Sequence, residues 1–264
     1  MKTIFALITD PYDRQARLIP GLLVILPVLV PLIAVYGPKH PILTSILSLL
    51  STCGAVYALA SIARGRGKKL EELLIKEWGG MPTTIILRHQ DTFLDSISKS
   101  RYHDAITAKL GIAMPTAQEE AENPAKADDT YIGATKRLRE VTRSNKKLLF
   151  KENIAYGFHR NMLAMKTAGI FTCICGVIYG LLISQILVCK APYFVPVNLT
   201  NVGLATGLTL LISLALLAAW IFYFDKDAVR RIGLVYAERL FECLPSLPGK
   251  RNSKSSATST NSSN

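Results

Sequence analysis

The chain has 264 residues, of which 50% are hydrophobic, and it carries a formal net charge of +12. All but two of its 31 Lys and Arg residues fall in three stretches, which alternate with four long uncharged apolar runs. A soluble domain seldom needs four uncharged runs of this length, so the pattern excludes an ordinary soluble globular core.

The four apolar runs are each long enough to cross a membrane. Spanning a hydrocarbon core of about 30 Å takes about 20 apolar residues at helical rise. Backbone amides in lipid must be hydrogen-bonded within their own segment, so we expect each run to be an α-helix. One short connection joins the first run to the second, and another joins the third run to the fourth, so we expect two helical hairpins. The runs are Leu18–Tyr36, Pro41–Ala63, Thr167–Cys189 and Val202–Phe224.

The basic residues predict how the protein faces, because Lys and Arg near helix ends favour the cytoplasmic side. They crowd into the N-terminal segment, the central segment and the C-terminal tail, whereas only Lys39 and Lys190 lie in the two hairpin connections. We therefore expect an integral protein of the plasma membrane or of a bacterial inner membrane. Both termini would be cytoplasmic, and the first run would be retained rather than cleaved.

The apolar runs contain no Asp, Glu, Lys, Arg or His. Pumps and ion-coupled transporters usually place ionisable groups inside the membrane, because their chemistry needs them despite the cost of desolvation. The sequence therefore argues against active transport. The same sequence is compatible with a pore lined by hydroxyls, backbone carbonyls or apolar gates.

Small residues recur along the last two runs and predict close helix packing. Such residues let helix backbones approach one another where lipid removes the hydrophobic driving force. The stripe can serve packing within one four-helix bundle or contact between subunits of a homo-oligomer, and the sequence does not choose between them. The residues are Thr172, Gly176, Gly180 and Ser184, with Gly203 and Gly207 in the fourth run.

The predicted fold is an all-α integral membrane protein with four transmembrane helices in two hairpins and a mostly helical cytoplasmic module between them. Its parts are an N-terminal cytoplasmic segment (1–17), the first hairpin (18–63), the module (64–166), the second hairpin (167–224), a cytoplasmic amphipathic helix (225–248) and a disordered tail (249–264).

Within the module, Leu70–Trp78 has the spacing of a helix, which Gly79-Gly80 would end. Ile85-Ile86-Leu87 fits either a short strand or the start of a helix. The segment from Pro115 to Asp129 is rich in acidic residues and broken by two prolines, and we expect a mobile loop there.

Two His/Asp pairs in the module are candidates for chemistry: His89 with Asp91, and His103 with Asp104. Imidazole beside a carboxylate can bind a metal or exchange protons near neutral pH. His103-Asp104 invites comparison with metal-dependent phosphohydrolases, but those need further His and Asp ligands at longer, patterned separations, so a lone His-Asp dipeptide does not identify one. Solvated or ion-paired polar residues are the competing interpretation, and we expect no metal ion and no cofactor.

A basic stretch, Thr135–Lys151, is predicted to form an amphipathic helix that continues into the third run. Its charges suit anionic lipid headgroups or structural ion pairs, and a phosphate or nucleotide ligand is another use for them. Nucleic acid is not needed to explain them. The candidate ligand- or lipid-binding residues are Lys136, Arg137, Arg139, Arg143, Lys146 and Lys147.

Three functions fit these observations. The first is a multi-pass membrane interaction or effector protein whose basic cytoplasmic module senses a protein partner or a ligand, with spans that anchor, oligomerise or form a pore. The second is a membrane-tethered, metal-assisted hydrolase that uses His89, Asp91, His103 and Asp104, provided that these residues converge in one pocket. The third is a passive channel or exporter component. A non-enzymatic role is the preferred interpretation.

Overall fold

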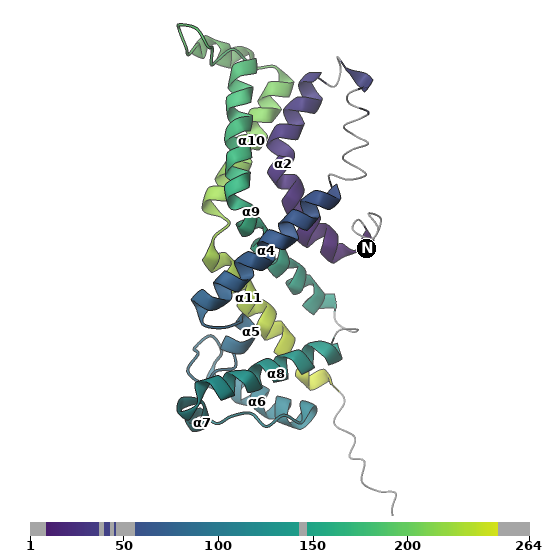
Figure 1. Ribbon diagram of the computed structural model, residues 1–264, viewed down its shortest axis with the longest axis vertical. Coiled ribbons are helices and arrows are strands. Elements are labelled where there is room, and N and C mark those ends of the chain that lie inside the picture. Colours follow the sequence, from purple (N-terminus) through teal and green to yellow (C-terminus); the bar gives the residue numbers. More distant parts are fainter. Residues whose placement is uncertain (1–8, 37–39, 43–44, 46–55, 143–146, 248–264) are drawn as a thin grey trace, which may run out of the picture. The chain divides into compact units, whose positions relative to one another are not determined.

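The computed structural model describes residues 9–36, 40–42, 45, 56–142 and 147–247 (Figure 1). Within these ranges the chain is all-helical and forms no strand, apart from an isolated bridge between Leu187 and Phe194. The α-helices are α2 (Ile19–Pro31), α4 (Val56–Trp78), α5 (Pro82–Ile85), α6 (Ser96–Leu110), α7 (Ala117–Glu122), α8 (Pro124–Thr142), α9 (Lys147–Ile183), α10 (Leu204–Phe222) and α11 (Lys226–Phe241). The π-helical turns η1 (Asp13–Leu18) and η2 (Leu32–Tyr36) flank α2, and the 3₁₀ turns η4 (Pro196–Asn201) and η5 (Leu244–Ser246) precede α10 and follow α11.

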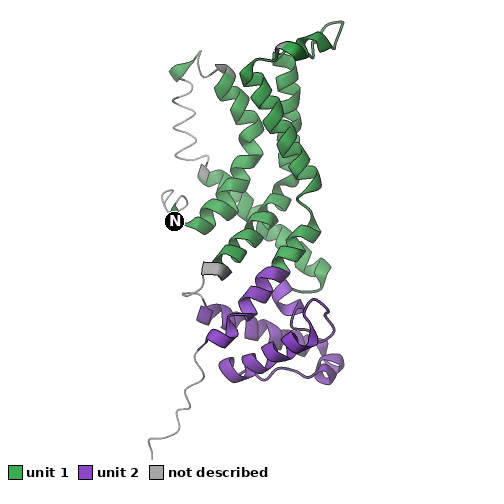
Figure 2. Ribbon diagram, turned by 180° about the vertical axis from the view of Figure 1, so that it is seen from behind, with its two compact units in different colours: residues 1–80, 150–233 green, residues 81–149, 234–264 purple. Residues whose placement is uncertain are grey.

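By packing, the chain divides into two compact units (Figure 2). Unit 1 comprises residues 1–80 and 150–233, and unit 2 comprises residues 81–149 and 234–264. One boundary therefore falls inside α11, whose first half belongs to unit 1 and whose second half belongs to unit 2. These units are defined by contacts, whereas the six predicted parts describe membrane topology, which stays a prediction.

Three helical segments of the described chain are long and apolar enough to cross a membrane: Asp13–Ala34, Leu149–Ile183 and Leu204–Phe222. The prediction of an all-helical membrane protein is confirmed at this level. Most of the predicted second span, Pro41–Ala63, lies outside the described residues, so four spans in two hairpins stay a prediction. The described part of that run, from Val56, continues as α4 through the basic segment Arg64–Lys69 to Trp78.

The small residues of α9 pack inside unit 1. Thr172 donates a hydrogen bond to the carbonyl oxygen of Val24 in α2 at 2.5 Å. A Cβ atom added at Gly176 would overlap Ser213 of α10, and one added at Gly180 would press against Leu210. By contrast, a Cβ at Gly203 would meet no atom within 4 Å. Gly207 is similarly open, and the hydroxyl of Ser184, just after α9, donates to the carbonyl oxygens of Gly180 and Leu181 in the last turn of that helix.

The acidic segment from Pro115 to Asp129, expected to be a mobile loop, is helical: it forms α7 and the start of α8. Local capping explains the difference. Thr116 and Glu119 form a capping box, each side chain accepting from the other residue's backbone N–H, and this starts α7. Pro124, expected to break structure, is the first residue of α8, where a proline's missing N–H costs nothing.

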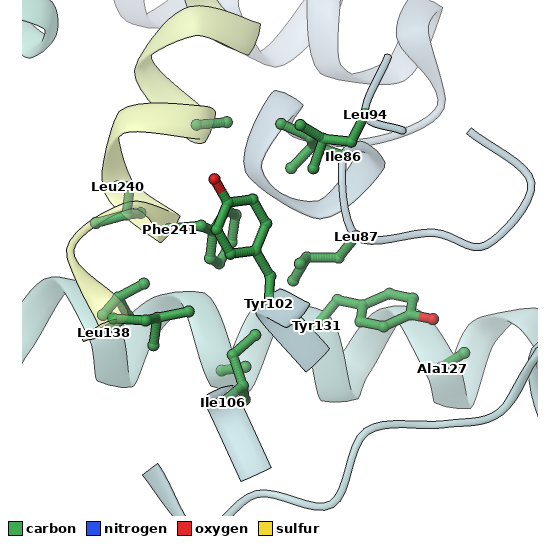
Figure 3. Close-up of a cluster of buried hydrophobic side chains, with 13 residues drawn as sticks. Ile86, Leu87, Leu94, Tyr102, Ile106, Ala127, Tyr131, Leu138, Leu240 and Phe241 are labelled. Carbon is green, nitrogen blue, oxygen red and sulfur yellow. The ribbon is translucent and has the colours of Figure 1, made fainter. Parts of the chain in front are cut away.

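The core of unit 2 joins residues that are distant in sequence (Figure 3). Tyr102 and Ile106 of α6 meet Tyr131 and Leu138 of α8, and Leu240 and Phe241 of α11 complete the cluster. Ile86 and Leu87, which follow α5 in a turn rather than a strand, are fully buried in the same core. This packing fixes α6 and the chain after Leu87 against a common core.

Candidate functional site

Unit 2 contains a cavity of about 570 Å³ whose walls come from three segments. Pockets of about 300–1,000 Å³ are the usual size for small ligands. One wall is the turn from His89 to Leu94, the second is a face of α6, and the third is the connection Met114–Thr116. The α6 residues on this wall are Ser96, Lys99, Ser100, His103, Asp104 and Thr107.

The spacing of these α6 residues explains why they share one face, because side chains three and four residues apart are neighbours on a helix. The ends of α6 are well defined. The side chain of Asp95 caps the first turn by accepting from the N–H of Ser98 at 2.8 Å. Gly111 ends the helix in the left-handed region with φ 70°, a conformation that glycine adopts at little cost.

Glu120 of α7, which does not line the cavity, holds the His89 turn by hydrogen bonds. Its carboxylate accepts hydrogen bonds from the N–H of His89 at 2.9 Å and from the hydroxyl of Tyr131 at 2.5 Å. Burial alone would raise the pKa of Glu120, but these hydrogen bonds outweigh it and lower the pKa below its ordinary value. Burial and the adjacent Glu120 carboxylate raise the pKa of Tyr131.

A second contact secures the same turn. Arg88 donates to both carboxylate oxygens of Asp128 in α8, at 2.8 and 2.7 Å. This fork raises the pKa of Arg88, which therefore keeps its positive charge. Arg88, Asp128 and Glu120 are not among the residues that line the cavity.

Lys99 holds the turn from the cavity side. Only 6% of this residue is exposed, and its ammonium donates to the carbonyl oxygens of His89 at 3.1 Å and Asp91 at 2.5 Å. Within the described ranges, Lys99 forms no ion pair with a carboxylate. The backbone of residue His89 therefore contacts opposite charges, with its N–H donating to Glu120 and its C=O accepting from Lys99.

Both candidate histidines have one ring nitrogen occupied by the backbone. Nε2 of His89 lies 2.9 Å from the carbonyl oxygen of Pro115, and Nε2 of His103 lies 2.9 Å from that of Leu87. A carbonyl oxygen only accepts, so each Nε2 carries its proton, and in the neutral ring Nδ1 is the basic atom. Burial lowers the pKa of His103, and the nearby His89 and Lys99 reinforce that shift against the Leu87 hydrogen bond.

The structure brings His89, Asp91, His103 and Asp104 together around one cavity. The two imidazole rings meet edge to face with centroids 4.8 Å apart. Over the described part of the chain, however, no group of three or more His, Cys, Asp or Glu side chains is placed to hold a metal ion. The arrangement suits binding of a polar molecule, with the two Nδ1 atoms available as proton acceptors.

The candidate basic residues separate into different environments. Lys136 and Arg137 are exposed on α8, and Arg137 pairs with Glu140 at 3.1 Å on the surface. Arg139 turns inward, where it donates to Thr83 at 3.4 Å and lies over the ring of Tyr236. Arg143 and Lys146 lie outside the described residues, as does the side chain of Lys147. A single helix across Thr135–Lys151 therefore stays a prediction.

Sequence reasoning missed Lys99, Glu120 and Tyr131, which shape the site. Their partners lie 8 to 31 residues away in sequence. Only one local signal was present: the Thr116–Glu119 spacing of a capping box, which marks the start of the helix that carries Glu120. Comparisons of the chain with protein-family models, with curated proteins and with solved structures found no match.

Proposed function

We propose that this chain is a multi-pass membrane interaction or effector protein whose cytoplasmic unit senses a small polar ligand. The observation that carries the proposal is the cavity of about 570 Å³ in unit 2, where polar side chains of three segments converge. A pocket of ligand size with a few convergent polar groups is the ordinary form of a small-molecule site.

The membrane part of the proposal is supported by the three membrane-length helices and by the distribution of basic residues. Four spans in two hairpins would anchor the protein, with both termini in the cytoplasm. Lys136 and Arg137, both exposed, are suited to anionic lipid headgroups or an acidic surface on a protein partner. The spans would serve as an anchor, as an oligomerisation surface or as a pore.

Ligand binding can be tested with the full chain in lipid nanodiscs. The protein is incubated with the small-molecule fraction of a cell extract, washed, and analysed for retained molecules by mass spectrometry. Ser100→Trp places an indole in the cavity, and Ala108→Trp, on the same helix but outside the cavity lining, is the matched control. We expect a molecule that the unmodified and Ala108→Trp proteins retain and that Ser100→Trp does not. Identical profiles for all three proteins would refute the proposal.

The pore version needs its own measurement. The purified chain is reconstituted into dye-loaded vesicles, and its oligomeric state is measured in parallel. Dye release by an oligomer, increased by the retained molecule, would support a ligand-controlled pore. A strictly monomeric protein that leaves vesicles intact under every stimulus would refute the pore, and a plain anchor or scaffold would survive.

A membrane-tethered hydrolase is the second candidate, favoured by the convergence of His89, Asp91, His103 and Asp104 on one cavity. A basic Nδ1 atom of either histidine could accept a proton from attacking water. The test is hydrolysis of p-nitrophenyl phosphate with and without Mn²⁺, by the unmodified protein and by His103→Gln. Turnover that His103→Gln abolishes would support the hydrolase, whereas equal, background-level rates would remove it.

A further inference from the structure

Lys99 lines the cavity, and its positive charge has no carboxylate in contact among the residues that the structure describes. Its two hydrogen bonds end on carbonyl oxygens, which satisfy two of its three N–H donors but leave its positive charge unneutralised. A buried charge that lacks a partner is costly, so such groups usually meet an opposite charge. Here the described residues supply no carboxylate within ion-pairing distance.

A buried carboxylate, Glu120, bonds the backbone of the same residue as Lys99. Glu120, which is 6% exposed, bonds the N–H of His89, whereas Lys99 bonds the C=O of the same residue. Glu120 is absent from the cavity lining, and Lys99 is part of it. The cavity lining therefore includes the positively charged residue of the two and not the negatively charged one.

We infer that the cavity binds a small molecule bearing an anionic oxygen group, phosphoryl or carboxylate, which the ammonium of Lys99 holds. This inference rests on the proposed function, since it names the ligand class of the same site. The hydroxyls of Ser96, Ser100 and Thr107, on the same wall, are suited to bonding the polar remainder of such a molecule.

Two carboxylates in the wall limit the affinity without removing this preference. Asp91 is engaged with its own turn, where it accepts from the N–H of Phe93 at 3.0 Å. Asp104 is exposed at the cavity, so water screens its charge. Both repel an anion, and neutralising the exposed one should tighten binding while leaving the turn intact.

The test uses glucose, glucuronate and glucose 6-phosphate, which share a pyranose ring and differ in charge. Binding to the full chain in nanodiscs is measured by titration calorimetry. Lys99→Gln keeps amide N–H donors for the two carbonyl oxygens and removes the charge. Lys109→Gln, on the same helix but outside the lining, is the matched control. We expect at least one charged sugar to bind the unmodified and Lys109→Gln proteins about tenfold more tightly than glucose. Lys99→Gln should abolish that preference.

Asp104→Asn supplies a second arm with a surface residue, in case Lys99→Gln disturbs the fold. It should tighten binding of the same charged sugar about two- to threefold relative to its effect on glucose binding. Equal binding of charged and neutral sugars, or no binding by any of them, would overturn the ligand class. So would a preference that survives Lys99→Gln. The proposed function has its own test, which is whether the protein retains a molecule from a cell extract. These sugar-binding results do not affect that test, so the ligand class can be wrong while the proposed function is correct.

Discussion

The turn that carries His89 depends on two buried charges of opposite sign. Glu120 and Lys99 bond the N–H and the C=O of one residue, and Tyr131 and Asp91 complete their contacts. Hydrogen bonds to charged groups contribute about 1.5–3 kcal/mol each, roughly twice the neutral value. The conformation of this cavity wall is therefore set by electrostatics rather than by apolar packing alone.

Replacing Glu120 with Gln should expose that dependence. The N–H of His89 and the hydroxyl of Tyr131 both bond one carboxylate oxygen of Glu120, and the N–H of Gln90 donates to the other at 3.5 Å. Gln keeps one accepting oxygen but carries no charge, and its NH₂ group cannot accept from the N–H of Gln90, so all three contacts are weakened or lost. We expect the local opening free energy of the turn to fall by about 2 kcal/mol. The measurement is hydrogen exchange of the His89 and Gln90 amides. Glu122→Gln on the exposed face of α7 is the control, and equal exchange in the two variants would contradict the account.

The buried imidazole of His103 predicts a pH dependence of stability. Burial, His89 and Lys99 lower its pKa in the folded chain, whereas the unfolded chain titrates near 6.5. Between these two values the unfolded chain binds more protons, so stability falls as pH drops below about 6.5. The lowered pKa of Glu120 acts in the same direction, but only below about 4.5.

Thermal unfolding followed by near-ultraviolet circular dichroism should therefore show a lower midpoint at pH 5.5 than at pH 7.5. His103→Gln can still donate to the Leu87 carbonyl oxygen but does not titrate. It should reduce the difference between the two midpoints. A midpoint of the unmodified protein that does not move across this range would show that His103 is not held neutral.

At the scale of elements, close packing of α4 against α9 depends on one glycine. Gly67 is buried beside Asn161, a fully buried residue that donates to the carbonyl oxygen of Ala16 at 2.5 Å. A Cβ atom at Gly67 would overlap the amide oxygen of Asn161. Nearby, Glu71 of α4 accepts from the hydroxyl of Tyr156 at 3.0 Å and from Arg160 at 2.9 Å. Polar groups thus fix this crossing.

Gly67→Ala should destabilise unit 1 by about 1–3 kcal/mol, because overpacking a filled contact forces side chains or backbone to move. Gly65→Ala is the matched control on the same helix, since a Cβ there meets nothing within 4 Å. Replacing an exposed helical glycine with alanine should instead stabilise by about 0.5–1 kcal/mol. Unfolding midpoints in detergent that shift in the same direction for both variants would contradict the packing.

Features that depend on neighbouring residues could be predicted from the sequence, whereas features that depend on contacts between distant residues could not. The sequence predicts a helix over Leu70–Trp78 and an amphipathic helix over 225–248. The structure has both, since α4 contains the first segment and α11 covers most of the second. Gly79, with φ 74°, follows the end of α4, as predicted. The prediction of a loop from Pro115 to Asp129 is wrong, because the Thr116–Glu119 capping box and a proline at the first position of α8 favour helices there. The charges beside His89 depend on contacts across α6 and α7, which no local pattern encodes.

At the scale of the whole molecule, the two proposed roles, membrane anchoring and ligand binding, belong to different units. The membrane-length helices belong almost entirely to unit 1, and the cavity belongs to unit 2. The proposed sensing role requires that the cavity of unit 2 face the cytoplasm. The connection between α9 and α10, which contains the exposed Cys189, should then face the opposite side.

Labelling with a membrane-impermeant maleimide tests this arrangement most directly. Intact cells that carry the Ser96→Cys variant are treated, and modified positions are identified by peptide mass spectrometry. Ser96 is exposed and lies at the cavity, so the new thiol reports which side unit 2 faces. We expect Cys189 to be modified in intact cells and the thiol at position 96 only after permeabilisation. Modification of position 96 in intact cells would contradict a cytoplasmic sensor.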